Sequence, residues 1–383
     1  MFDHHIDLPA DGSFDARCLP THGGVYLITD EQDRPILLTS CENLRRVVVN
    51  RLAAPPPDQK SKRANLGEIA RHIHWRPTFS RFETAWAHWQ AARELNPAGY
   101  RETIAFGPAW FLCVNLADRT PRLVPVKETA SGGVEAIGPF PTRRDVEEWQ
   151  HMLEDAFDLC RYYHILEQAP HGQACAYFDM GKCPAPCNGS IPLEAYRRMM
   201  ADALAFSAGH RQPRLAVLQE SMQAAARSLA FEKAASIRQT LDRAAALAEK
   251  PQYRHVCDLA SCCWLAIQRG GPARRSEKTA LVKPFFIRSG AVEVGGPFSL
   301  ADIDGAVPQW LAQCGRCCVL PPRSVDEQTA RWEVLWLVSK FLFQAERAPG
   351  LLYRFDQLPD AAALSGAIRE RFMATDEDST GQS

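Results

Sequence analysis

A short loop at residues 175–189, CAYFDMGKCPAPCNG, contains three cysteines and two prolines, and it constrains this chain more than any other segment. Three thiolates do not close a tetrahedral site, and the nearest fourth candidate is a cysteine at the end of the preceding predicted helix. The four candidate ligands are Cys160, Cys175, Cys183 and Cys187, in the spacing C-x14-C-x7-C-x3-C. Four thiolates from one compact segment suit zinc or an iron–sulfur cluster.

The spacing of these cysteines bears on the choice between the two metals. Structural zinc sites usually combine closely spaced C-x2-C pairs, which this set lacks, and a wide loop fits the larger cubane cluster better. Buried cysteines without a metal are the third interpretation. The chain has 13 cysteines, and its N-terminus does not resemble a secretory signal, which favours a reducing compartment where metal ligands are commoner than disulfides.

Length and charge leave the function class open. A chain of 383 residues can hold two or three domains, and its 44 basic and 45 acidic residues give a formal net charge of −1. A strongly basic balance would indicate nucleic acid, but a local basic patch is sufficient for such binding. The sequence has no run of about 18 apolar residues, so we expect no membrane span and a cytoplasmic protein.

Hydrophobic patterns predict the elements around the cysteine loop. The patterns favour an α+β fold, and the polar tail at 375–383 is expected to be disordered. Strands are expected at 23–29, 35–40, 104–126 and 256–300, and helices at 42–52, 80–96, 142–160, 191–249 and 325–346.

The segment from Cys160 to Ser190 resembles the cysteine region of the UvrC family, the incision subunits of bacterial nucleotide excision repair. Cys160 follows a short apolar stretch as in that family, Cys175 stands in its second position with Ala174 in place of a proline, and residues 183–189 (CPAPCNG) match its C-x-x-PC-x-G motif closely. The resemblance implies a [4Fe–4S] cluster on Cys160, Cys175, Cys183 and Cys187.

A pair of helices is expected after the cysteine loop. Apolar residues recur at spacings of three and four, which predicts an antiparallel pair with a seam formed by Leu215, Leu218, Met222, Ala225, Leu229, Ala234, Ile237, Leu241 and Ala244. The segment LAFEKAASIR resembles the UVR motif, through which this family docks a like hairpin on UvrB. The matching, candidate partner-binding positions are Phe231, Glu232, Ala234, Ala235 and Arg238, whereas Gln239 replaces the usual aspartate. Simple intramolecular packing is the alternative.

The N-terminal part resembles a GIY-YIG nuclease with replaced catalytic positions. Its first motif survives as Gly24-Val25-Tyr26, and Asn43-Leu44-Arg45 survives after the second. The family's second tyrosine and lysine fall on Leu37 and Ser40, its metal-binding glutamate on His88 and its closing asparagine on Tyr100.

Those replacements predict a weak or absent nuclease. Magnesium prefers hard oxygen ligands, so a neutral imidazole at His88 substitutes poorly, and Mg²⁺ is expected only if the site works. Tyr26 and Arg45 remain as candidate catalytic residues, and Arg45 and Arg46 as candidate DNA contacts. Tyr26 is alternatively a strand residue with its hydroxyl in solvent. Glu83, on the same predicted helix as His88, is a possible replacement ligand.

The C-terminal part departs from the family. We find neither the carboxylates of its RNase H-type nuclease nor its helix–hairpin–helix repeats, although residues 256–300 faintly resemble the strands that follow the UVR motif. A second cysteine group, Cys257, Cys262, Cys314 and Cys317, has one knuckle-like spacing and could bind zinc, or could simply be buried.

The resemblance divides the chain into six parts and leaves three functional hypotheses. The parts are a degenerate GIY-YIG-like mixed α/β domain (15–105), a β-rich connector (106–145), a helical four-cysteine region (146–212), the UVR helical hairpin (213–250), an α+β region (251–350) and a C-terminal segment with a disordered tail (351–383). The first hypothesis is a repair protein that binds DNA and a UvrB-like partner without a working incision site. The others are an endonuclease with a rearranged site and an iron–sulfur redox or iron sensor.

Overall fold

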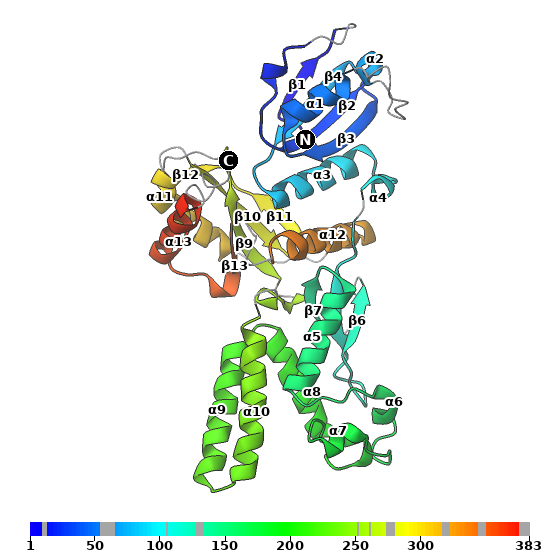
Figure 1. Ribbon diagram of the computed structural model, residues 1–383, viewed down its shortest axis with the longest axis vertical. Coiled ribbons are helices and arrows are strands. Elements are labelled where there is room, and N and C mark those ends of the chain that lie inside the picture. The colour runs from blue at the N-terminus through cyan, green and yellow to red at the C-terminus, as the bar shows by residue number, and fades with distance from the viewer. Residues whose placement is uncertain are drawn as a thin grey trace.

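A computed structural model describes residues 1–9, 14–53, 66–104, 106–127, 134–250, 253–259, 262–272, 280–315, 322–343 and 350–374. The molecule is elongated (Figure 1), with the N-terminal domain at one end and a helical hairpin at the other. Within these ranges the strand pairings are antiparallel and helices accompany every sheet, which confirms the α+β class. None of the helices described is long and apolar enough to cross a membrane.

The N-terminal domain is a four-stranded sheet between two helices. The sheet order is β1-β4-β2-β3, formed by β1 (His4–Asp7), β4 (His72–Pro77), β2 (Gly24–Thr29) and β3 (Pro35–Cys41). Helix α1 (Leu44–Leu52) packs on one face and α3 (Arg81–Leu95) on the other, with two short helices, α2 (Leu66–Ile69) and α4 (Tyr100–Thr103), beside them. Asn43 and Ser80 cap α1 and α3, as expected of residues whose side chains accept a backbone N–H.

A second four-stranded sheet carries the cysteine region. Its order is β6-β5-β7-β8, formed by β6 (Val124–Lys127), β5 (Trp110–Val114), β7 (Glu135–Phe140) and β8 (Cys257–Asp258). Helix α5 (Arg143–Ala156) covers it, lies within the predicted helix at 142–160 and is capped by Thr142. The chain then continues through α6 (Tyr163–Leu166), α7 (Ala176–Asp179), the 3-10 turn η2 (Pro186–Asn188) and α8 (Leu193–Ser207).

The predicted hairpin is formed by α9 (Arg211–Arg227) and α10 (Phe231–Ala248), which pack along their length. Leu218, Ala225 and Ala244 are buried in the seam, but the prediction was wrong for Leu229, which is 72% exposed. Helix α9 ends at Arg227, so Leu229 falls in the turn with a positive φ of 57°. The amides at 229 and 230 donate to the carbonyls at 226 and 225, which is the Schellman arrangement.

The C-terminal unit is a third sheet with helices. Its order is β11-β10-β9-β13, with β12 beside β10, formed by β11 (Ala291–Val294), β10 (Leu281–Arg288), β9 (Cys263–Arg269), β13 (Leu351–Arg354) and β12 (Phe298–Ser299). Helices α11 (Ile303–Cys314) and α13 (Ala361–Ala374) pack together over it, and α12 (Val325–Phe341) lies against α3. Further 3-10 turns are η1 (Ala16–Cys18), η5 (Leu300–Asp302) and η6 (Phe355–Gln357).

Two expected boundaries do not follow the structure. The division at residue 350 is wrong because β13 pairs with β9 and the α13 residues Leu364, Ile368 and Phe372 are buried in the same core as β10. The N-terminal domain also begins before residue 15, since β1 adds a strand to its sheet. The expected disordered tail at 375–383 lies outside the described residues.

Candidate functional site

The four predicted ligand cysteines lie around one irregular segment between α5 and α8. Cys160 follows α5, Cys175 precedes α7, and Cys183 and Cys187 flank the start of η2. A left-handed residue lies on each side of η2, Ala185 at φ 52° before it and Gly189 at φ 81° after it. Three of the thiols are buried, with Cys160 at 2%, Cys183 at 6% and Cys187 at 2% exposure, and Cys175 is half-buried.

The thiols act on one another electrostatically. A hydrogen bond between Cys160 and Cys183 raises the pKa of Cys160 and lowers the pKa of Cys183, which the Ala185 amide and the Arg161 guanidinium lower further. Burial raises the pKa of Cys187, and the charges of Cys183 and Cys175 raise it again. Four thiolates here would repel one another, and a bound metal group removes that penalty because it supplies positive charge.

Arg161 fastens the cysteine segment to its surroundings. Its guanidinium pairs with Asp155 on α5, donates to the Lys182 carbonyl at 3.3 Å and lies 4.4 Å from the centre of the Tyr177 ring. The backbone amide of Cys160 donates to the buried Tyr196 hydroxyl at 3.3 Å. The loop is therefore held by protein contacts on both sides of its thiols.

The cysteine segment also touches the hairpin. Asp158, two residues before Cys160, accepts from Arg243 of α10 at 3.0 Å, and burial raises the pKa of this carboxyl. A cavity of 630 Å³ lies beside this ion pair, and it is lined by residues of α5, the cysteine segment and α10, including Met152, Met180 and Asp242. The ion pair connects the candidate metal centre to the hairpin.

The surviving nuclease positions are built into the domain core. Tyr26 lies on β2 and is fully buried, so the interpretation with its hydroxyl in solvent is wrong. Its hydroxyl has no hydrogen-bond partner within 3.5 Å, and burial raises the pKa of this phenol. Arg45 donates to the carbonyls of Leu19 at 2.8 Å and Arg17 at 3.2 Å, whereas Arg46 is exposed on the surface of α1.

The replaced positions on α3 lie in a packed environment. His88 interacts with the Leu38 backbone on β3, burial lowers the pKa of its imidazole, and its Nε2 is buried without a hydrogen-bond partner. The structure thus places His88 against β3, the strand that carries Leu37 and Ser40. Around it, Val25, Ala87 and other apolar side chains fill the space between sheet and helix.

Glu83, the candidate replacement ligand, is already paired. It is fully buried, accepts the Phe79 amide at 3.0 Å, and its Oε1 lies 2.6 Å from Nζ of Lys283 on β10. Phe82 and Trp86 of the same helix contact Phe285 of β10 edge-on. Helix α3 is therefore the joint between the N-terminal domain and the C-terminal sheet.

Tyr100, at the position of the family's closing asparagine, belongs to the same joint. Its hydroxyl donates to both oxygens of Glu333 on α12, at 3.0 and 2.8 Å. Arg101 donates to this buried carboxylate at 2.7 Å and Trp89 at 2.8 Å. Three donors from the N-terminal domain thus meet one carboxylate of the C-terminal part, a contact that satisfies every oxygen of Glu333.

A hollow of 590 Å³ lies next to the second nuclease motif. Ser40, Cys41 and Glu42 line it together with residues that precede and begin α3, and Arg269 closes it from the C-terminal sheet. Glu42 is the carboxylate in this lining. Arg81 and Arg269 in the lining favour an anion such as phosphate, but the hollow offers a metal ion one exposed carboxylate.

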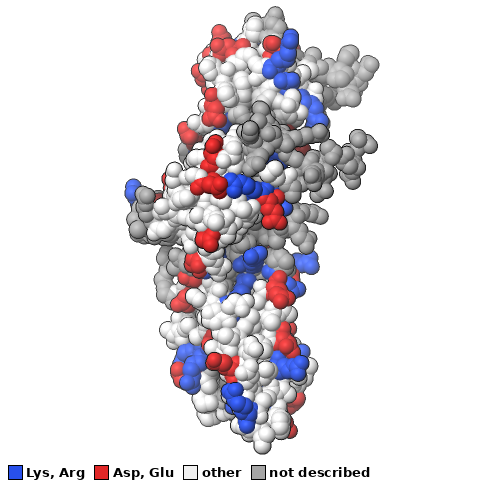
Figure 2. Space-filling view, turned by 90° about the vertical axis from the view of Figure 1, so that its left-hand side faces the viewer, with Lys and Arg blue, Asp and Glu red and all other residues white. Residues whose placement is uncertain are grey.

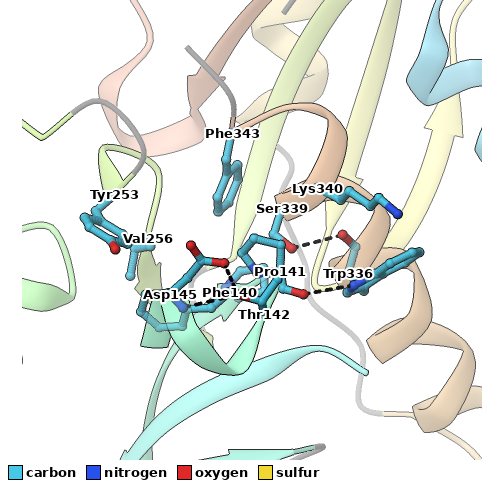
Figure 3. A pocket seen from close by; sticks show the side chains of 11 residues that line it. Phe140, Pro141, Thr142, Asp145, Tyr253, Val256, Trp336, Ser339, Lys340 and Phe343 are labelled. Atoms are coloured by element: carbon cyan, nitrogen blue, oxygen red, sulfur yellow. Dashed lines mark hydrogen bonds between the residues drawn. The ribbon is translucent and has the colours of Figure 1, made fainter. Parts of the chain in front are cut away.

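A smaller cavity of 320 Å³ marks the joint between the middle sheet and α12 (Figure 3). Aromatic side chains dominate its wall, and Trp336 donates through Nε1 to the Pro141 carbonyl at 3.1 Å. Ser339 donates to the Trp336 carbonyl at 2.9 Å, and Lys340 lies over the Trp336 ring. The Trp336 hydrogen bond holds α12 against the start of α5, whereas the Ser339 and Lys340 contacts lie within α12.

The hairpin positions that match the UVR motif are accessible. Phe231 is 66% exposed at the start of α10, directly after exposed Leu229. Glu232, Ala235 and Arg238 are exposed as well, and Ala234 is half-buried. The turn therefore presents two large apolar side chains at the far end of the molecule (Figure 1).

The second cysteine group is only partly brought together. The Sγ atoms of Cys257 and Cys262 lie 3.3 Å apart and both thiols are fully buried, while Cys314 is buried at the end of α11. Cys317 lies outside the described residues. In the described part of the chain, no three His, Cys, Asp or Glu side chains are arranged around a point that could hold one metal ion.

Comparison with known proteins rests on the same regions. Residues 109–206, which contain strands β5, β6 and β7 of the second sheet and all four cysteines, match the family model of the UvrC/Cho excinuclease middle domain. These residues belong to the UvrC/Cho middle-domain family. The chain is 26% identical to UvrABC system protein C of Corynebacterium jeikeium over 228 residues, which are 58% of this chain and 32% of that protein.

Two other relatives match the chain with similar identity and coverage. The chain is 26% identical to UvrABC system protein C of Thermobifida fusca over 72% of its own length and 41% of the relative's. It is 27% identical to the protein of the same name from Clostridium beijerinckii, over 65% of its length and 39% of the relative's. The chain thus spans about a third to two fifths of the relatives it matches. No solved structure matches it significantly.

Sequence reasoning missed the residues that form the joint around α3. Lys283 and Glu333 lie about 200 positions or more from their partners in the chain, and each appears in the sequence as an ordinary charged residue. A lysine in the centre of a strand whose neighbours are apolar was the available signal for Lys283.

Proposed function

We propose that this protein is a repair factor that holds a [4Fe–4S] cluster and docks a UvrB-type protein, but does not cut DNA with its N-terminal domain. The observation that carries the proposal is the joint around α3. The helix that carries the family's metal position is packed between its own sheet and the C-terminal unit, with Nε2 of His88 buried and Glu83 paired to Lys283.

The donor set fits the cluster. Cys160, Cys175, Cys183 and Cys187 supply four soft sulfur ligands in one segment that is anchored at both ends, and three of them are shielded from water. A bound cluster would cross-link this segment and could also carry an electron. The chain's own contribution is to place the thiols, exclude solvent and offset their negative charge with Arg161.

Binding to DNA is proposed together with the partner. On the face shown in Figure 2, basic and acidic side chains are interspersed along the length of the molecule. Arg45 is occupied by backbone carbonyls, which leaves Arg46 as the exposed basic residue among the predicted DNA contacts. Because phosphate contacts supply most non-specific affinity, such a surface favours DNA binding that a partner assists.

The hairpin tip provides the partner surface. Replacing Phe231 by serine is expected to weaken binding to a purified UvrB protein at least tenfold, or about 1.4 kcal/mol, because a 66% exposed aromatic anchor is lost. Val217→Ser is the matched control, since Val217 is 49% exposed on α9 but distant from the tip. Equal affinities of the Phe231→Ser and wild-type proteins by biolayer interferometry would exclude the tip as the docking site.

The turn itself gives a second test. Leu229 occupies a left-handed conformation that costs an L-residue roughly 1–2 kcal/mol and that glycine adopts freely. We therefore expect Leu229→Gly to stabilise the hairpin by about 1 kcal/mol in urea unfolding while it weakens partner binding. A variant that binds as well as wild type would show that the exposed leucine has no part in docking.

A rearranged endonuclease is the second candidate function, and the hollow beside Ser40 is the observation that favours it. Its single carboxylate predicts that any cleavage would depend on Glu42. Incision that requires a divalent ion and disappears in Glu42→Gln would support this alternative over the first proposal.

A further inference from the structure

The sheet of the N-terminal domain carries a set of histidines that the repair function does not use. Strands β1 and β4 pair with His5 opposite His74 and Asp7 opposite His72. Side chains two residues apart on a strand share a face, so these four groups project from the same side of the sheet. The motif is therefore His-x-His on one strand with a third histidine on its antiparallel neighbour.

The imidazoles are already close. The ring centres of His5 and His74 are 6.0 Å apart, and those of His72 and His74 are 6.4 Å apart. Two imidazoles that share a tetrahedral ion with metal–nitrogen distances near 2 Å have ring centres roughly 5 Å apart. The His5 and His74 rings are stacked, the His72 and His74 rings are tilted, and the three do not yet converge on one point. Binding therefore requires rotation about side-chain torsions that brings His5 and His72 each roughly 1 Å or more closer to His74.

Two carboxylates complete the set. Oδ1 of Asp7 lies 2.8 Å from Nδ1 of His72, the arrangement in which a carboxylate holds an imidazole with its Nε2 turned outward to a metal. Asp33, from the turn between β2 and β3, lies 3.8 Å from that Nε2. Each of these groups also lies within electrostatic range of His74.

Neighbouring side chains partly bury the histidines on this face of the sheet. Phe2 packs against His74, with ring centres 6.1 Å apart, and also against the apolar residues between the sheet and α3. His72 and His74 are consequently half-buried, while His5 and Asp33 remain accessible at the rim. One wall of the site is thus apolar and the other is open for an ion to enter.

We propose that His5, His72 and His74 bind a divalent transition-metal ion, and that zinc is the preferred ion. Asp33 is the fourth ligand, and Asp7 is the residue that positions His72. Three imidazoles with a carboxylate suit zinc and exclude the hard ions magnesium and calcium. The site is separate from the four cysteines, which lie beyond the second sheet at the other end of the molecule (Figure 1).

The test compares zinc binding by the full-length protein and its variants, with the cysteine region in the same loaded state in each. Competition with a chromophoric chelator is expected to show one zinc site in wild type that becomes at least 100-fold weaker in His72→Gln/His74→Gln. Asp7→Asn is expected to weaken it 10–100-fold, as loss of an orienting carboxylate does. His4→Gln is the matched control, because His4 stacks on Trp75 on the opposite face of the sheet, and it should bind as wild type does.

A second readout separates this site from the thiols. Co²⁺ bound here should give visible bands without thiolate-to-metal charge transfer, and these bands should vanish in the double variant. Circular dichroism checks that the surface substitutions leave the fold intact. Undiminished zinc affinity in His72→Gln/His74→Gln, or no zinc site beyond the cysteines in wild type, would overturn the proposal.

Discussion

The Cys183→Ser protein is expected to purify without iron, whereas wild type prepared anaerobically carries about four irons per chain and absorbs broadly in the visible range. Cys183 is buried, and its thiol is hydrogen-bonded to Cys160. A serine there is a poor ligand for iron, so the cluster loses one of its four attachments. Since metal binding to such a segment is coupled to its folding, residues 160–190 should also become sensitive to proteolysis.

The control for that experiment is another cysteine substitution. Cys41 is half-buried on β3 in the N-terminal domain, outside the cysteine segment, so Cys41→Ser should retain iron and colour. Iron content and the visible absorption spectrum are measured for the wild-type, Cys183→Ser and Cys41→Ser proteins. A wild-type protein that contains only zinc, or no metal after anaerobic purification, would contradict the cluster assignment and leave the segment without its proposed cofactor.

Loss of Lys283 is expected to destabilise the joint between the N-terminal domain and the C-terminal sheet. In Lys283→Met the fully buried Glu83 carboxylate keeps only the Phe79 amide, and removal of one partner of a buried ion pair typically costs about 3–5 kcal/mol. Urea unfolding followed by tryptophan fluorescence would measure it, because Trp86 and Trp89 lie on the same helix.

The matched control removes both charges. Glu83→Gln/Lys283→Met leaves no uncompensated charge, so it should recover a large part of the stability lost in the single variant. A Lys283→Met protein within about 1 kcal/mol of wild type would show that Glu83 is not committed to this pair. That result would also reopen its role as a metal ligand in the nuclease-like domain.

The local features of this protein could be predicted from its sequence because local physical rules produce them. The cap residues Asn43, Ser80 and Thr142 begin their helices where side-chain oxygens can accept backbone amides. The cysteine spacing and the helical periodicity of 214–250 were visible for the same reason. Leu229 shows the limit, since its apolar character fits the seam, but helix α9 ends two residues earlier and leaves it in the turn.

Contacts between segments that are distant in the sequence could not be predicted from local patterns. Glu83, a candidate metal ligand in the sequence, meets Lys283 from a different sheet, and Tyr100 meets Glu333 from α12. Nothing in the periodicity of either segment specifies which partner a buried charge will find. The short strand β1 was missed because four residues, HHID, carry too little alternation to indicate a strand before its neighbour β4 is known.

The most direct test of the account is an incision assay with a UvrB protein loaded on a damaged DNA duplex, run with Mg²⁺ or Mn²⁺ and with binding measured in the same samples. The account predicts that the wild-type protein joins the UvrB–DNA complex, that Phe231→Ser does not, and that neither strand is cut. Strand cleavage that depends on the divalent ion and is lost on substitution of Tyr26, Glu42 or His88 would contradict it.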